Sequence, residues 1–359
     1  MAVVSGLDRL GVPVVMVTRP LSRSLSVTQG KGLSLVAAKV SGIMEAVEHA
    51  HAEEIELPLR LATERALRRS SRVLSPSQLN LARPGYHADT SLLWVRGRTS
   101  REEQAIWVPY DAVHLDACSP TATGPSWLLS SSNGLASGNG VAEAIAHGLF
   151  EVLERHLTCE FYDLSAAEQE ALRLDLTTIR DEPARSLLRQ LADVQVEVCV
   201  WDISGGLGVP CFFCELLDRE EDVVRGVPRA RGMGCHSDRQ VALLRAVTEA
   251  VQSRITLIAG SRDDIVDVGS GARRADIASA HRQQRARSSL VATRSFDQVA
   301  SSDFEDFDAE VSWLSSRLEQ AGLGAAAVVD LSKGGLPVSV VRVLVPGARL
   351  SSAVHSRGT

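Results

Sequence analysis

The stretch Ala136–His156, ASGNGVAEAIAHGLFEVLERH, decides how the rest of the chain is interpreted, because its layout occurs three times. Glycines and an asparagine precede an apolar-periodic segment. This is typical of a helix N-terminus, where free backbone N–H groups and the helix dipole attract anions. Two acids, Glu151 and Glu154, follow within this segment. Residues at i and i+3 share a helix face, so the stretch predicts a helix that presents paired carboxylates.

Two further copies of this layout lie upstream and downstream. They are GKGLSLVAAKVSGIMEAVEHA (Gly30–Ala50) and GCHSDRQVALLRAVTEAVQSR (Gly234–Arg254). The first acids of the three copies align, and the second positions follow three residues later; the aligned residues are Glu45, Glu151 and Glu249, then Glu48, Glu154 and Gln252. Repeats that share a core pack about a common pseudo-axis, so we expect five carboxylates to converge.

A strand element recurs beside these helices. Each occurrence carries a glycine turn, a proline and a β-branched run, as in LDRLGVPVVMVTRP, DISGGLGVPCFFCELL and DLSKGGLPVSVVRVLVP. The last two follow further strand-like runs, VEVCVWDI and AAAVVDL, so each predicts a hairpin. The chain therefore predicts an α/β (α+β) fold of pseudo-repeated strand or hairpin and helix units around a central site.

Composition excludes several classes of protein. The 359 residues are 45% apolar and 23% charged, which is typical of a soluble globular protein. A net charge of −6 gives no electrostatic basis for binding nucleic acid. No apolar stretch is long enough to span a membrane and no basic leader precedes the first apolar run, so we expect a cytoplasmic protein. The pair Cys211 and Cys214 lies in a strand-like run and lacks a second ligand pair, which favours buried thiols over a zinc site.

The acids are unusual in their surroundings. A lone pair of glutamates on a helix ordinarily faces solvent, but apolar residues flank these pairs, so we expect the helices to be buried. Buried carboxylates need a cation. An all-oxygen ligand set favours Mg²⁺, which combines carboxylates with substrate phosphates, so the pattern indicates an ATP site. The candidate metal ligands are Glu45, Glu48, Glu151, Glu154 and Glu249.

Basic and amide side chains complete this hypothesis. Lys31, Arg155 and Arg254 could neutralise phosphate oxygens, and Asn139 could hydrogen-bond the nucleotide. The sequence around Gly30–Gly32 lacks the glycine spacing and the Ser or Thr of a Walker A motif, and no G-x-G-x-x-G follows a strand. Any nucleotide site is therefore of another kind.

At these residues the chain resembles the YcaO family, whose signature is three acidic motifs that bind ATP and Mg²⁺. The motifs are an S-x-x-x-E-x-x-E-R helix, an E-x-x-E-R helix with an upstream Asn, and an E-x-x-Q-x-R helix. The resemblance implies a single YcaO-like domain over residues 1–359, with a core of about 5–347 and a short tail, 348–359, that does not match. With Lys31 added, the implied ATP-binding residues are Lys31, Ser41, Glu45, Glu48, Asn139, Glu151, Glu154, Arg155, Glu249, Gln252 and Arg254.

The runs RSLSVTQGKG and GCHSDRQVALLRAVTEAVQSRITLIAGSRDD look most like the branch that accompanies a TfuA-type protein. The resemblance then implies thioamidation of a ribosomally made precursor peptide. In that reaction ATP phosphorylates a backbone amide oxygen, and a sulphur donor displaces it. Two departures from the family pattern are His49, where the first motif usually has Arg, and the short tail.

Two alternatives remain open. The first is azoline formation, in which a Cys, Ser or Thr of the peptide attacks the activated amide. The second is a non-catalytic peptide-binding protein. Because dimers are common among relatives, an isologous homodimer is the default expectation.

Overall fold

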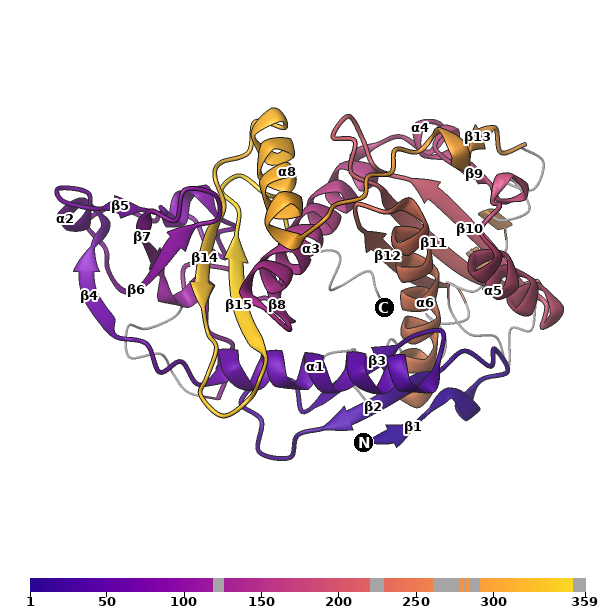
Figure 1. Ribbon diagram of the computed structural model, residues 1–359, viewed down its shortest axis with the longest axis horizontal. Coiled ribbons are helices and arrows are strands. Elements are labelled where there is room, and N and C mark those ends of the chain that lie inside the picture. Colours follow the sequence, from indigo (N-terminus) through magenta and orange to yellow (C-terminus); the bar gives the residue numbers. More distant parts are fainter. Residues whose placement is uncertain are drawn as a thin grey trace.

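A computed structural model of the protein describes residues 1–118, 126–219, 229–260, 275, 278–279, 282–283 and 291–350. Three long helices, each packed on a sheet, dominate the described chain (Figure 1). The tail expected at 348–359 lies outside the described residues beyond position 350.

The first unit is a three-stranded antiparallel sheet with one long helix on it. In sheet order its elements are β1 (Ala2–Val3), β2 (Val14–Thr18) and β3 (Val27–Lys31), with helix α1 (Leu35–Glu53). The third unit repeats this plan. It consists of β10 (Val196–Asp202), β11 (Cys211–Asp218), β12 (Ala230–Cys235) and helix α6 (Arg239–Ala259).

The middle unit carries helix α3 (Val141–Asp163) on a larger, seven-stranded sheet. Its strands are β4 (Leu59–Thr63), β5 (Arg72–Val73), β6 (Ser91–Thr99), β7 (Ala105–Pro109), β8 (Leu135–Gly138), β14 (Ala327–Asp330) and β15 (Ser339–Leu344). The order is β5-β7-β6-β14-β15-β8 with β4 paired to β6, and every pair except β5–β7 is antiparallel. The chain thus returns from its C-terminal half to complete a sheet begun near residue 60.

The remaining elements are short. The helices are α2 (Glu64–Leu67), α4 (Ala166–Ala171), α5 (Glu182–Asp193) and α8 (Phe307–Gln320), and a parallel pair joins β9 (Leu174–Asp175) to β13 (Arg294–Ser295). The 3₁₀ turns are η1 (Ser5–Leu7), η2 (Pro76–Gln78), η3 (Tyr110–Ala112), η4 (Leu176–Thr178) and η5 (Phe296–Gln298). None of the described helices is both long and apolar enough to cross a membrane.

Glycines let two of the acidic helices lie directly on the strands that precede them. A β-carbon built on Gly30 in β3 would lie 2.0 Å from the Ala38 carbonyl oxygen of α1. One built on Gly232 in β12 would lie 2.2 Å from the Ala250 backbone nitrogen of α6. Only glycine permits such close backbone approach, so these glycines set how near each carboxylate stripe lies to its sheet.

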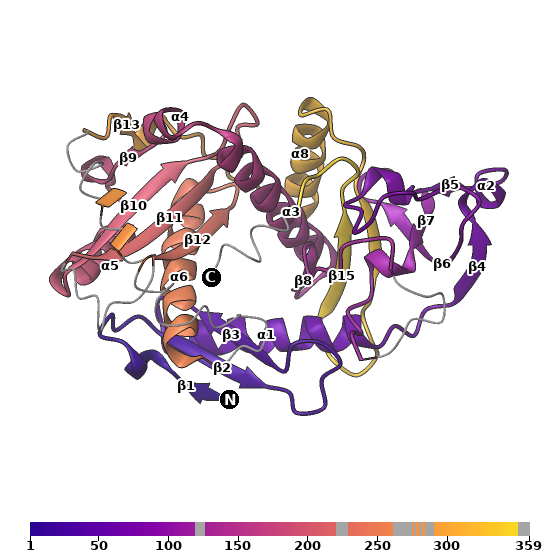
Figure 2. The same ribbon diagram turned by 180° about the vertical axis from the view of Figure 1, so that it is seen from behind.

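The three units interlock in a cycle. Each acidic helix packs on the strand that precedes it and also touches the strand of another unit: α1 contacts β8, α3 contacts β12, and α6 contacts β3. Figures 1 and 2 show these helices approaching the middle of the molecule from three sides. The expected pseudo-repeated α/β fold is confirmed, and so are the hairpins β10–β11 and β14–β15. Cys211 and Cys214 are fully buried in β11, as their apolar run predicted.

Candidate functional site

The cyclic packing brings together the acidic pairs of α1 and α3 and the single Glu249 of α6. Their charges interact in succession. In addition to burial, the charges of Glu45 and Glu151 raise the pKa of Glu48, and the charge of Glu249 raises the pKa of Glu151 and of Glu154. Each of the five carboxylates expected to converge therefore lies within electrostatic reach of at least one other.

The cluster carries more carboxylates than its nearby positive charges can neutralise, and the pKa values of two of them are raised well above their usual value. Burial raises the pKa of Glu48 to about 8, with further increases from Glu45 and Glu151, although the Ser137 hydroxyl donates to Glu48 Oε1 at 2.5 Å. Burial and the charge of Glu249 raise the pKa of Glu154 to about 7. Raised carboxyl pKa values are the expected result when buried acids lack a sufficient counter-charge.

Glu249 behaves differently because a lysine reaches it across the units. Burial alone would raise its pKa, but Lys31, Arg155 and Arg245 lower it below its usual value. Lys31 Nζ lies 2.7 Å from Glu249 Oε2, and this ion pair joins β3 to α6. Arg155 Nε lies 4.0 Å from Glu154 Oε1. Lys31 and Arg155 thus lie inside the carboxylate cluster.

Backbone donors fix the orientation of two more carboxylates. The Gln29 N–H donates to Glu45 Oε2 at 3.1 Å, and the Gly134 N–H donates to Glu151 Oε2 at 3.3 Å. Both donors belong to segments that lead into acidic helices, β3 in the first case and the turn before β8 in the second. The connections between repeats therefore position the acids that the repeats present.

The other residues expected from the motifs lie around this cluster. Ser41 Oγ accepts a hydrogen bond from the Lys31 N–H at 3.4 Å. Asn139 is exposed at the start of α3, where its amide and backbone N–H both donate to Glu143. Gln252 is half-buried on α6, one turn after Glu249. Ser41 and Gln252 lie on helices that bear the acids, and Asn139 lies two residues before α3.

Two basic residues of the site, Arg342 and Arg245, were not among the residues expected to bind ATP. Arg342 in β15 is 3% exposed; its guanidinium donates to the carbonyls of Ala112 and Ser131, and its charge acts on Glu151. The one available signal was an arginine within the apolar run VVRVLVP. Arg245, one turn before Glu249, shared the acidic stripe in the sequence and lies near Glu154 and Glu249.

The structure does not bring Arg254 to the carboxylates. Its side chain is 1% exposed, its Nε donates to Asp8 Oδ2 at 2.6 Å, and its Nη2 lies 3.2 Å from Asp218 Oδ1. Arg254 therefore joins α6 to Asp8, which directly follows η1, and to β11 through a buried ion network. Its position two residues after Gln252 in the sequence does not reveal this role.

Replacing Arg254 with Met is expected to destabilise the protein by about 3–5 kcal/mol, because two acids lose a buried cationic partner. The ATP affinity of the folded fraction should stay unchanged. Denaturant unfolding and calorimetry measure the two quantities. The control is Arg155→Met, which should weaken ATP binding because Arg155 lies among the carboxylates. A stable Arg254→Met protein that fails to bind ATP would contradict the structural assignment.

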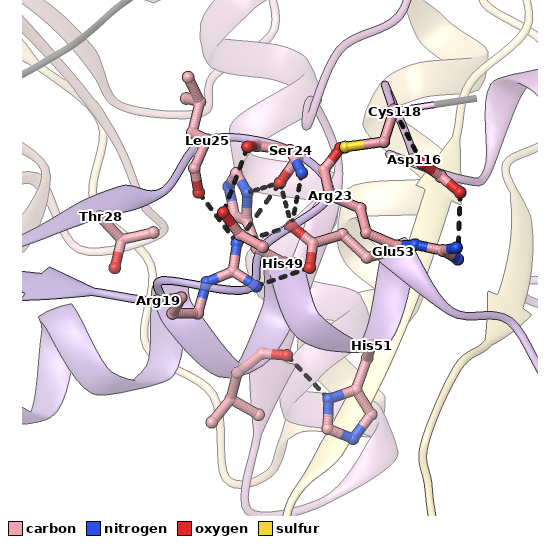
Figure 3. Close-up of polar contacts among 12 residues, drawn as sticks. Arg19, Arg23, Ser24, Leu25, Thr28, His49, His51, Glu53, Asp116 and Cys118 are labelled. Atoms are coloured by element: carbon pink, nitrogen blue, oxygen red, sulfur yellow. Dashed lines mark hydrogen bonds and ion pairs between the residues drawn. The ribbon is translucent and has the colours of Figure 1, made fainter. Parts of the chain in front are cut away.

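His49, the departure from the family's usual Arg, belongs to a separate buried network at the end of α1 (Figure 3). Its Nδ1 lies 3.0 Å from Ser24 Oγ, and the Ser24 N–H donates to Glu53 Oε1 at 2.9 Å. Arg19 donates to both carboxylate oxygens of Glu53, from Nη2 to Oε1 at 2.7 Å and from Nη1 to Oε2 at 2.8 Å. Burial would raise the pKa of Glu53, but Arg19 and Ser24 lower it to about 2. The network joins the segment that leads into β3 to the C-terminal turn of α1.

The cluster fits Mg²⁺ held jointly with a phosphate ligand. Among the described residues, no three His, Cys, Asp or Glu side chains are close enough to form a complete metal site. Mg²⁺ does not need one, since it commonly takes one or two carboxylates and completes its shell with waters and substrate phosphates. The raised pKa values of Glu48 and Glu154 show where added positive charge would be most favourable.

Nearly all of these interlocked strand–helix units and their carboxylate centre fall within the match to one protein family. Residues 29–349 match the family model described as YcaO cyclodehydratase, ATP- and Mg²⁺-binding, and the chain belongs to the YcaO family. YcaO proteins bind ATP and Mg²⁺ and are ATP-dependent enzymes of the cyclodehydratase type.

Two sequence relatives are similar to this chain over nearly its whole length. An uncharacterized protein of Mycobacterium tuberculosis is 34% identical over 99% of this chain and 78% of its own. An uncharacterized protein in the tfuA 3′ region of Rhizobium leguminosarum bv. trifolii is 33% identical over 96% of this chain and 81% of its own.

Solved structures confirm the fold. A YcaO protein from Methanopyrus kandleri, bound with AMPPCP and Mg²⁺, has a TM-score of 0.72 at 24% identity and covers 95% of this chain and 84% of its own. A heterocyclase in complex with substrate and cofactor has a TM-score of 0.73 at 20% identity over 94% of this chain. This chain spans about half of that heterocyclase, 49% of its length.

Proposed function

We propose that this protein uses ATP and Mg²⁺ to phosphorylate a backbone amide oxygen of a ribosomally made peptide, which a sulphide donor then converts to a thioamide. The converging carboxylates carry the ATP-dependent part of this proposal. The relative in the tfuA 3′ region supports the choice of thioamidation and of a TfuA-like partner. A single domain and an isologous homodimer remain predictions.

The acidic residues are proposed to bind Mg²⁺, and the basic residues are proposed to bind phosphate. Glu45, Glu48, Glu151, Glu154 and Glu249 are the proposed Mg²⁺ ligands, and the ion would stabilise negative charge on the transferring phosphoryl group. Lys31 and Arg155, whose charges both act on Glu249, bind phosphate oxygens. Ser41, Asn139 and Gln252 line the nucleotide, while Arg254 acts through the fold.

The reaction balances without an external oxidant or reductant. The amide oxygen attacks the γ-phosphorus of ATP and ADP leaves. Hydrosulphide adds to the activated carbon, phosphate departs with the original amide oxygen, and the proton brought by the sulphur is lost to phosphate. An amide oxygen is a poor leaving group, and its phosphorylation makes the exchange favourable.

Mass spectrometry of the peptide tests this proposal. The wild-type protein is incubated with ATP, Mg²⁺, sulphide, a TfuA-like partner and a candidate precursor peptide. Exchange of one oxygen for sulphur, with ADP and phosphate released, is the expected result. Loss of one water that disappears when a Cys, Ser or Thr of the peptide is replaced by Ala would instead establish azoline formation, the activity in the family's description. An unmodified but tightly bound peptide would establish a non-catalytic role.

A further inference from the structure

A second group of side chains lies one helical turn from the carboxylates. His147 precedes Glu151 by four residues on α3, and Arg245 precedes Glu249 by four on α6, so each shares a stripe with an acid. His236 lies between β12 and α6, with its ring stacked on Phe150 at 5.0 Å between centroids. The charge of Arg245 acts on both histidines, on Glu154 and on Glu249, so the group adjoins the acidic cluster.

Arg245 has no anionic partner of its own. Within the described part of the chain its guanidinium makes no hydrogen bond or ion pair, and its Nε is shielded from solvent. A shielded N–H without a hydrogen-bond partner is costly, because the donor loses water without replacement. The position therefore suits an anion supplied by a ligand, and phosphate matches the fork of donors that arginine presents.

The hydrogen bonds of the two histidines assign them opposite tautomers. His147 Nδ1 lies 3.1 Å from the Ser137 carbonyl oxygen, which can only accept, so Nδ1 carries the proton and Nε2 has a free lone pair. His236 Nδ1 instead accepts from the Asp238 N–H at 3.0 Å, which places the proton of His236 on Nε2. Burial and Arg245 lower the pKa of both rings, so both are neutral at pH 7.

We propose that Arg245, His147 and His236 form the subsite for the second half of the reaction. In it, Arg245 binds the phosphate of the activated amide and the Nε2 lone pair of His147 accepts the proton of the attacking nucleophile. The His236 Nε2–H donates to the same phosphate. The nucleophile's S–H bond breaks as its sulphur bonds to the amide carbon; phosphate then leaves with the original oxygen and recovers the proton from His147. This proposal rests on the proposed function, and it assigns the nucleophile-activating base.

The test separates phosphorylation from nucleophilic attack. His147→Asn keeps a side-chain N–H for Ser137 but removes the base. In water labelled with oxygen-18, this variant should bind ATP within about twofold of wild type and still consume it with peptide present. Thioamide formation should fall by about 10²–10⁴-fold, the usual contribution of a general base. Water should then replace the sulphur nucleophile, so that the recovered amide contains oxygen-18.

Controls distinguish a chemical role from a structural one. His156→Asn alters a histidine of the same helix whose Nδ1 accepts from the Arg349 N–H. In this variant ATP consumption should remain coupled to thioamide formation. Imidazole added to His147→Ala should restore part of the thioamide formation. A His147→Asn protein that forms thioamide at the wild-type rate for each ATP consumed would overturn the inference. A His147→Asn protein that has lost ATP binding would overturn it as well. Failure of the wild type itself to modify the peptide would refute the proposed function instead.

Discussion

Glu151→Gln is expected to slow ATP-dependent turnover severely while the protein stays folded. The substitution preserves shape but removes a charge from the centre of the cluster, where Glu151 interacts with Glu48 and Glu249. A bound metal ion contributes several kcal/mol of charge stabilisation to phosphoryl transfer, so weakening its site should slow turnover roughly a thousandfold or more. Glu48→Gln should have the same effect. Phosphate release in the presence of peptide measures it.

The stability of these variants provides the matching control. The pKa of Glu48 is raised from 4.5 to about 8, so the folded protein holds this proton more tightly than the unfolded chain. Without Mg²⁺, wild-type stability should therefore fall as the pH rises from 4.5 to 8, and Glu48→Gln should lack this component. Above pH 8 the variant should melt at the wild-type temperature or higher. Glu160→Gln, on the exposed side of α3, should change neither activity nor melting. Unfolding of Glu48→Gln or Glu151→Gln would mean that the acids are structural.

ATP binding is expected to require Mg²⁺. Among the described residues, the five carboxylates have Lys31 and Arg155 within the cluster and Arg245 and Arg342 beside it. Burial already opposes the charged forms of Glu48 and Glu154. A polyphosphate adds negative charge to this region, so it should bind only when a divalent cation accompanies it. Removing Mg²⁺ should weaken ATP binding by at least about a hundredfold, or roughly 2.7 kcal/mol.

Calorimetry with Mg²⁺ and with EDTA measures this difference. Arg155→Met should weaken the binding of Mg²⁺–ATP and leave the requirement for the metal in place. Equal affinity for ATP under both conditions would contradict a carboxylate–metal site and would assign phosphate binding to the arginines alone.

The sequence by itself determined which residues form the acidic pairs and on which elements they lie. Helical spacing places Glu45 with Glu48 and Glu151 with Glu154 on single faces, because a helix has a fixed period that is independent of tertiary context. The threefold recurrence also gave the pseudo-repeated fold and the convergence of the acids. These are properties of local geometry and of repetition, and both can be read along the chain.

Only the tertiary structure decided which cations reach the cluster. Lys31 and Arg254 looked alike in the sequence, yet Lys31 crosses to Glu249 whereas Arg254 is buried against Asp8 and Asp218. The tautomer of His147 likewise depends on the Ser137 carbonyl, ten residues away on another element. Long side chains select partners among residues distant in sequence, and that choice depends on how the three units interlock, which no local period specifies.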